Sequence, residues 1–209
     1  MAVITDINLQ KSKKRANIFI DNKFCCGLDL TTVVKNGLKK GVEISESRLL
    51  EIQKESEMSE ATEKALSLLE RQKYTKSRLR AKLKEKGYMD ELVDEVIDKL
   101  TEYGYVNNAD YIKSFVSSNP NKSKKEIERN LLQKGIKKEE LASYYEKIDE
   151  PEDEQEKCDR VAEKYMRSKE RNEAVAKKLM SHLLYKGFSF SNAKNSVFKF
   201  TSSEVDDYD

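Results

Sequence analysis

Three stretches of the chain concentrate lysine and arginine, and their side chains are suited to binding a polyanion. Residues 71–88 carry eight basic side chains and one acidic side chain, Glu85. Residues 121–138 and 164–187 each carry seven basic side chains against two acidic ones. Ammonium and guanidinium groups bind phosphates or carboxylates by charge, without covalent chemistry. The spacing therefore predicts a binding protein with three separated basic patches.

Residues able to perform covalent or metal chemistry are few. His182 is the single histidine, and its place beside the predicted core residue Leu183 favours a surface or partly packed role. The three cysteines match no ligand spacing, and the adjacent Cys25 and Cys26 would point to opposite faces of a strand. No glycine-rich phosphate loop is present. We therefore expect no enzyme activity, no catalytic residue, no metal and no cofactor.

The first basic stretch ends in a motif that recurs twice. Residues 83–88 are LKEKGY, residues 131–136 are LLQKGI and residues 183–188 are LLYKGF, so the glycines lie 48 and then 52 residues apart. A helix often ends with a left-handed residue, a conformation that glycine adopts without strain, and the flanking apolar residues then contact each other. Repetition at this period predicts stacked helical units.

Composition agrees with a charge-rich helical protein that has small cores. Of 209 residues, 37% are charged and 37% hydrophobic, with no tryptophan and two prolines. A net charge of +2 means that any basic surface must arise from segregated charges. No apolar run approaches the roughly 20 residues that a membrane helix needs, and the N-terminus has no signal core. We expect a soluble, cytoplasmic protein.

The N-terminal region has a strand pattern. Asp21 and Asn22 tolerate the left-handed backbone of a hairpin turn, and they lie between two apolar runs. Because a lone hairpin is marginally stable, we expect a three-stranded sheet that packs on helices. The expected strands are residues 3–9, 16–20 and 24–28, and the expected helices are residues 30–36 and 45–55.

From about Ser59 the apolar spacing is helical throughout. Thr75 and Asp90 are predicted helix caps, Ser123 with Glu126 is a predicted capping box, and residues 190–200 are a predicted helix. The expected fold is mainly α, an elongated array of three tandem three-helix repeats after a small N-terminal β-hairpin/α extension. The expected boundaries are 1–55 for the extension, 56–106, 107–150 and 151–203 for the repeats, and 204–209 for an acidic tail.

Acidic residues follow the first two basic stretches, in residues 90–102 and 139–156. One interpretation is that the basic middle helices face a periodic polyanion, or a filament with a repeating groove. The other is that basic and acidic helices neutralise each other across repeat boundaries, because exposed charge runs are usually solvated surface. Tyr74 is the one ring inside a basic stretch without an evident core role, so the stacking signature of single-strand binders is weak.

Residues 71–88 (RQKYTKSRLRAKLKEKGY) and 100–111 (LTEYGYVNNADY) resemble the RecX family of bacterial recombination regulators. The order of parts is also similar, an N-terminal extension followed by three three-helix units. The resemblance covers residues 56–200 and is strongest over 65–135. It departs from the family at Asn107-Asn108, where acids are usual, and at residues 117–121, which lack a common arginine.

The resemblance implies a regulator that binds the RecA recombinase and its filament on single-stranded DNA, within the helical groove. Such proteins modulate filament growth and inhibit ATP hydrolysis, strand exchange and coprotease activity, in recombination, DNA repair and the SOS response. We expect a monomer with no membrane partner and weak direct DNA binding. The candidate contact residues are Arg71, Lys73, Tyr74, Lys76, Arg78, Arg80, Lys84, Lys124, Lys125, Arg129, Lys177 and Lys178.

Two other functions stay open. Three-helix units can place one helix in the major groove, so the protein could bind DNA independently of RecA. Few asparagine, glutamine or arginine residues cluster at one helix start, which disfavours that function. The chain could also be a helical adaptor for another protein, with its charges serving as ordinary surface.

Overall fold

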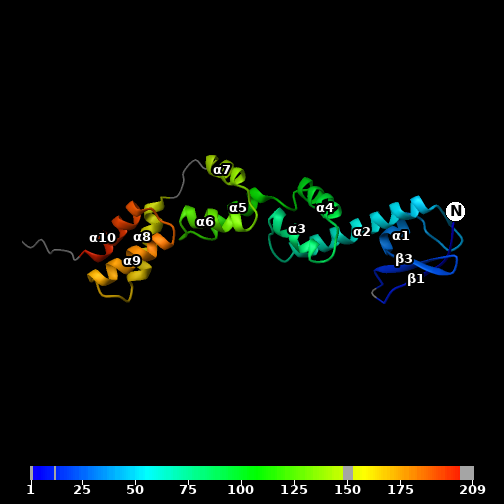
Figure 1. Ribbon diagram of the computed structural model, residues 1–209, viewed down its shortest axis with the longest axis horizontal. Helices are drawn as coiled ribbons and strands as arrows, with labels where there is room; N and C mark the ends of the chain where they lie inside the picture. Colours follow the sequence, from blue (N-terminus) through cyan, green and yellow to red (C-terminus); the bar gives the residue numbers. More distant parts are fainter. Residues whose placement is uncertain (1, 12, 148–152, 203–209) are drawn as a thin grey trace, which may run out of the picture. The chain divides into compact units, whose positions relative to one another are not determined.

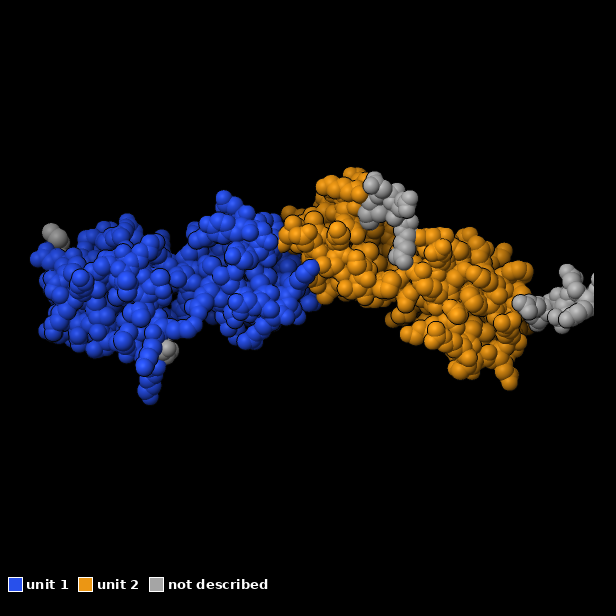
Figure 2. Space-filling view, turned by 180° about the vertical axis from the view of Figure 1, so that it is seen from behind, with its two compact units in different colours: residues 1–106 blue, residues 107–209 orange. Residues whose placement is uncertain are grey.

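The computed structural model describes residues 2–11, 13–147 and 153–202. Within those ranges the chain forms four strands and ten helices, so the predicted mainly helical fold class with a small N-terminal strand region is confirmed. The chain divides into two compact units, residues 1–106 and 107–209 (Figure 2). The predicted acidic linker at residues 149–156 and the tail at 204–209 lie partly or wholly outside the described residues.

The N-terminal strands form an antiparallel sheet in the order β3-β2-β1-β4. Its strands are β1 (Ala2–Leu9), β2 (Arg15–Ile20), β3 (Lys23–Asp29) and β4 (Glu43–Ile44). Asp21 and Asn22 take positive φ values of 49° and 64° in the β2–β3 turn, as predicted. The prediction of three strands was wrong by one, because residues 43–44 pair with the start of β1. Two residues are too few to show an alternating pattern.

Two helices cover this sheet, α1 (Leu30–Lys35) and the N-terminal part of α2 (Glu46–Leu69) (Figure 1). The predicted break between a helix at 45–55 and another from Ser59 was wrong, because α2 is continuous. No glycine or proline interrupts residues 46–69, and Ser45 caps the start through its side chain. Ser56 is buried and accepts the Asp29 amide N–H at 2.6 Å, which ties α2 to the sheet. The expected domain boundary at residue 55 therefore falls inside a helix.

Helix α2 contributes to two hydrophobic cores. Ile52 packs into the sheet core with Ile4, Ile18 and Leu28. Farther along the helix, Ala61 and Ala65 pack into the core that α2 forms with α3 (Lys76–Lys84) and α4 (Asp90–Glu102). Because one helix serves both cores, the strands and the first three-helix group belong to the same compact unit.

We call α2–α4, α5–α7 and α8–α10 the first, second and third repeats. The second has its own core around Ile112, Ile127 and Leu131, and the third around Leu179 and Leu183. Residues 190–201 are helical, as predicted despite their alternating phenylalanines. These repeats comprise α5 (Asn108–Ser117), α6 (Lys124–Gln133), α7 (Lys138–Glu146), α8 (Glu154–Met166), α9 (Glu173–Tyr185) and α10 (Phe190–Thr201).

The recurrent lysine–glycine motif ends the middle helix of every repeat. Gly87, Gly135 and Gly187 have φ values of 91°, 79° and 90°, which are left-handed. The N–H of Ile136 donates to the Leu131 carbonyl at 3.1 Å, and that of Phe188 donates to the Leu183 carbonyl at 3.2 Å. These are the bonds of a Schellman ending. The predicted left-handed glycine is confirmed in all three repeats, and the predicted Schellman bond is confirmed in the second and third.

The predicted caps at the helix starts are only partly confirmed. Thr75 caps α3 by accepting the Arg78 N–H at 3.2 Å, as predicted. Asp90 is the first residue of α4 and not its cap; the cap position belongs to Met89, which makes no side-chain bond. Ser123 accepts the Glu126 N–H, which is one half of the predicted capping box. The Glu126 carboxylate instead lies 3.9 Å from the Lys122 ammonium.

Candidate functional site

Helix α3 presents most of the first basic patch. Leu79 and Leu83 lie one turn apart and are fully buried, so the remaining positions of this short helix face outward. Arg71, Lys73, Arg78, Arg80 and Lys84 are exposed, and Lys76 is half-buried.

Part of this patch is neutralised inside the repeat. Arg80 lies 2.5 Å from Asp94, and Lys84 lies 2.8 Å from Asp90. Both acids belong to α4, so this neutralisation occurs within one repeat and does not need the predicted pairing across repeat boundaries. Exposed pairs of this kind contribute only about 0.2–1 kcal/mol. Arg71 and Arg78 form no ion pair with any residue that the structure describes.

Tyr74 has a core role that the local sequence pattern did not reveal. Its ring packs against the first-repeat core with Leu68 and Leu69. Its hydroxyl oxygen accepts the Gln72 side-chain N–H at 2.7 Å. The local sequence showed no evident core role for Tyr74, because the core that its ring packs against is assembled from α2, α3 and α4.

The basic residues of α6 differ in availability. The Lys124 backbone N–H donates to both carboxylate oxygens of Glu154, at 3.1 and 3.2 Å. Its ammonium lies 4.3 Å from the centre of the Tyr145 ring. Lys125 and Arg129 are both exposed and make no ion pair within the described ranges. These two residues are therefore the better candidates for an external anion in the second repeat.

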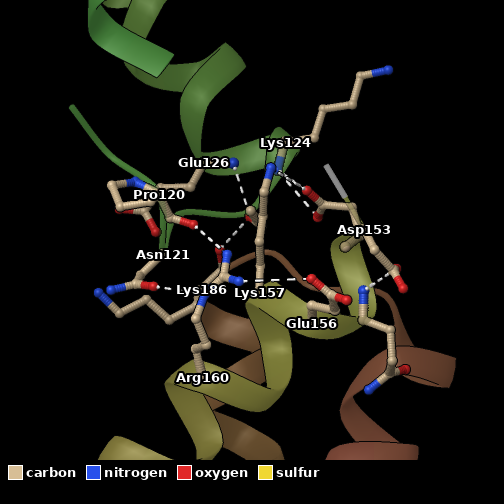
Figure 3. A network of polar contacts seen from close by, with 12 residues as sticks. Pro120, Asn121, Lys124, Glu126, Asp153, Glu156, Lys157, Arg160 and Lys186 are labelled. Carbon is tan, nitrogen blue, oxygen red and sulfur yellow. Dashed lines mark hydrogen bonds and ion pairs between the residues drawn. The ribbon is translucent and has the colours of Figure 1, made fainter. Parts of the chain in front are cut away.

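The start of α6 is also where the second and third repeats join (Figure 3). The buried Ser123 hydroxyl donates to the Lys186 carbonyl at 2.7 Å, while its oxygen accepts the Glu126 N–H at 3.1 Å. Arg160 on α8 donates to the Pro120 carbonyl at 3.1 Å and to the Asn121 side chain at 3.2 Å. The positive end of α6 thus faces the negative end of α9, a favourable arrangement of helix dipoles.

At Gly187 the backbone at the end of α9 lies close to the start of α6. A Cβ atom there would lie 2.9 Å from the Ser123 Oγ and 3.3 Å from the Lys125 Cβ. At Gly87, the equivalent position of the first repeat, a Cβ would meet nothing within 4 Å. The junction therefore brings Lys125 of the second repeat next to the end of α9.

Helix α9 carries the predicted Lys177 and Lys178. Lys177 pairs with Glu173 one turn earlier at 2.6 Å, on a well-solvated surface. Lys178 is exposed and forms no ion pair among the described residues. Both lysines border a cavity of about 500 Å³ that Tyr165, Ser181, His182 and Tyr185 complete. We call it the α9 cavity.

A second cavity, of about 560 Å³, lies at the junction and contains cations outside the predicted contact set. They are Lys122, Arg160, Lys164 and Lys186. They come from the turn before α6, from α8 and from the end of α9, so no linear pattern could reveal their proximity. His182 borders both cavities. Burial lowers the pKa of His182 below its ordinary value, and the charges of Lys186 and Lys169 lower it further.

The described ranges hold no group of three or more histidine, cysteine or acidic side chains placed to bind a metal. Cys25 and Cys26 are half-buried and Cys158 is buried, all as free thiols. None of the described helices has the length and apolarity needed to span a membrane.

Two segments of the first unit match models of a known protein family. Residues 2–45 match the model of the regulatory protein RecX N-terminal domain. Residues 61–100 match the model of the RecX first three-helix domain.

Whole-chain relatives extend the similarity. Regulatory protein RecX of Bacillus licheniformis is 32% identical over 216 residues, covering 99% of this chain and 80% of its own. Regulatory protein RecX of Clostridioides difficile is 30% identical over 214 residues, and the alignment covers 100% of both chains. A crystal structure of regulatory protein RecX aligns with a TM-score of 0.69 at 27% identity, over 96% of this chain and 98% of that one.

Proposed function

The chain belongs to the RecX family of regulatory proteins, and we propose that it binds the RecA recombinase and the filament that RecA forms on single-stranded DNA. The observation that carries the proposal is its similarity, along nearly the whole chain, to regulatory proteins of that family. On this proposal the bound protein limits ATP hydrolysis, strand exchange and coprotease activity in recombination, DNA repair and the SOS response. It acts in the cytoplasm as a monomer and catalyses no reaction itself.

We place the main contacts on the basic residues that are accessible and lack an internal acidic partner. An unpaired surface cation brings its whole charge to a polyanion, whereas a paired one must first separate from its partner. Arg80, Lys84 and Lys177 are therefore expected to contribute less than the others. The expected main contacts are Arg71, Arg78, Lys125, Arg129 and Lys178.

Binding to duplex DNA without RecA is less well supported. A helix that enters the major groove lies close to phosphates on both sides, so acidic side chains on it are unfavourable. Helix α4 carries Asp90, Glu91, Asp94, Glu95 and Asp98 along its length. It is poorly suited to that role.

The test is ATP hydrolysis by RecA on single-stranded DNA, with and without the protein, alongside co-sedimentation with the filament. We expect the protein to sediment with the filament and to reduce the hydrolysis rate as its concentration rises. Unchanged hydrolysis together with no co-sedimentation would refute the proposal. Tight, sequence-selective duplex binding in the absence of RecA would support the DNA-binding alternative.

A further inference from the structure

The junction cavity between the second and third repeats has an excess of positive charge. Four cations and one acid, Glu126, line it. Two of the cations have internal partners: Arg160 is bonded to Pro120 and Asn121, and Lys122 lies 3.9 Å from Glu126. The other two, Lys164 and Lys186, form no ion pair within the described part of the chain. Their charges remain available to a ligand.

The α9 cavity adjoins the junction cavity, because Tyr165 and His182 line both. The ring centres of these two residues lie 4.9 Å apart, and the Lys169 ammonium lies 2.9 Å from the centre of the Tyr165 ring. Tyr165 is thus already engaged by its neighbours. Tyr185, which also lines the α9 cavity, is 78% exposed. It provides a free aromatic face beside Lys177 and Lys178.

Cations with an exposed ring beside them suit a ligand that alternates charge and flat surface. Single-stranded nucleic acid has that chemistry, because its phosphates pair with lysine and its bases stack on aromatic rings. Duplex DNA has no unstacked base to offer Tyr185. An acidic peptide would use the lysines but would leave the exposed ring without a role. The junction cavity has a volume within the roughly 300–1,000 Å³ that ligand sites occupy, and the α9 cavity is a shallow, open depression beside it.

We propose that the two cavities form a subsite for a short segment of single-stranded DNA, with phosphates on Lys164 and Lys186 and a base stacked on Tyr185. This inference rests on the proposed function, since the filament supplies single-stranded DNA. It adds residues outside the predicted contact set and assigns the third repeat a direct contact with DNA. Lys177 and Lys178 then lie beside the DNA segment where its base stacks on Tyr185.

The test compares two fluorescent oligomers by anisotropy with the full chain alone. One is a thymidylate of about eight nucleotides, inside the roughly 4–16 that single-strand-binding domains cover. The other is an abasic phosphodiester of equal length. Tyr185→Ser should weaken thymidylate binding about 5- to 150-fold and leave abasic binding unchanged. Phe198→Ser, which removes a ring that is 73% exposed on α10, is the matched control and should change neither.

Charge is tested separately from stacking. The double variant Lys164→Gln/Lys186→Gln should weaken both oligomers and reduce the salt slope of log K by about 1.4, or roughly 0.7 for each phosphate that no longer meets a lysine. Lys194→Gln, an exposed lysine on α10 with no ion pair to the described residues, is the control and should change neither quantity.

Equal effects on the two oligomers from Tyr185→Ser, or no weakening from either set of substitutions, would overturn the subsite. An acidic peptide that binds as tightly as thymidylate and equally needs Tyr185 would also overturn it. RecA ATP hydrolysis, measured in parallel with the wild-type chain, reports on the proposed function alone. Its inhibition can persist while the subsite fails, and the two failures are therefore distinguishable.

Discussion

Replacement of Gly187 by alanine tests whether the Ser123–Lys186 hydrogen bond holds the second and third repeats together. Alanine at the left-handed φ of 90° costs about 1–2 kcal/mol wherever it occurs. At Gly187 the new Cβ would also lie 2.9 Å from the Ser123 Oγ. The hydroxyl must rotate or shift, and breaking its hydrogen bond costs about a further 0.5–1.5 kcal/mol.

Gly87→Ala supplies the matched control. Its φ is 91°, but its Cβ would meet no atom within 4 Å, so this variant has the strain without the crowding. Amide hydrogen exchange, read on peptides from α3 and α9, gives the local opening free energy in each variant. The destabilisation at α9 in Gly187→Ala should exceed that at α3 in Gly87→Ala by the hydrogen-bond contribution, about 2- to 12-fold in the opening equilibrium. The Glu126 amide should also exchange faster in Gly187→Ala alone.

A background of Ser123→Ala makes the comparison stricter. Without the Oγ the Ser123–Lys186 hydrogen bond is already absent, so Gly187→Ala should then cost less, keeping its backbone strain and the 3.3 Å contact with the Lys125 Cβ but losing the hydrogen-bond part. Equal effects of the two glycine variants in the wild-type background would refute the reasoning, as would an unchanged cost of Gly187→Ala when Ser123 is absent.

Three further outcomes are expected. Arg71→Gln/Arg78→Gln should weaken inhibition of RecA ATP hydrolysis more than Arg80→Gln does, because only Arg80 has an internal partner; equal effects would contradict the assignment. The pKa of His182, followed as the single histidine signal by NMR, should lie below 6.5. Because the pKa of His182 is lower in the folded than in the unfolded state, its contribution to stability should be fully present above about pH 6.5 and be lost as the pH falls through the folded pKa. The His182→Gln variant, which cannot titrate at this position, should lack this pH dependence. Ser59→Pro should cost about 3 kcal/mol or more and increase exchange in both the sheet and α3, because α2 serves both cores.

Features set by local backbone chemistry could be predicted from the sequence. The glycine-ended helices and the Asp21-Asn22 hairpin depend on conformations that few residues adopt, so short motifs identify them. The continuity of α2 could not be predicted as well. Residues 55–59 are mostly polar and contain two serines, which resemble a helix start, yet the buried Ser56 uses its hydroxyl on the sheet. A long-range partner of that kind leaves no signal in the local pattern.

The candidate site was predictable only in part, for a geometric reason. Basic stretches are visible in one dimension, but the pairing of Arg80 with Asp94 depends on how α3 and α4 pack. The cavity residues Lys164 and Lys186 lie on different elements, and their proximity depends on the junction at Ser123. One signal in the sequence could have pointed to Tyr185. It is an aromatic residue on α9 that does not coincide with the buried positions Leu179 and Leu183, so its ring is exposed.

Helix α2 also fixes a rotational phase between the sheet and the first repeat. Its 24 residues extend over about 36 Å, at about 1.5 Å and 100° per residue. Inserting one residue between Met58 and Ser59 would turn the sheet by about 100° relative to α3 and α4, whereas inserting seven would nearly restore the original direction about 10 Å farther away. Changes of length in this helix are therefore not equivalent to changes in a loop. The orientation of the N-terminal sheet about the α2 axis is fixed relative to the first repeat. Only insertions close to a whole number of helical turns would preserve that orientation.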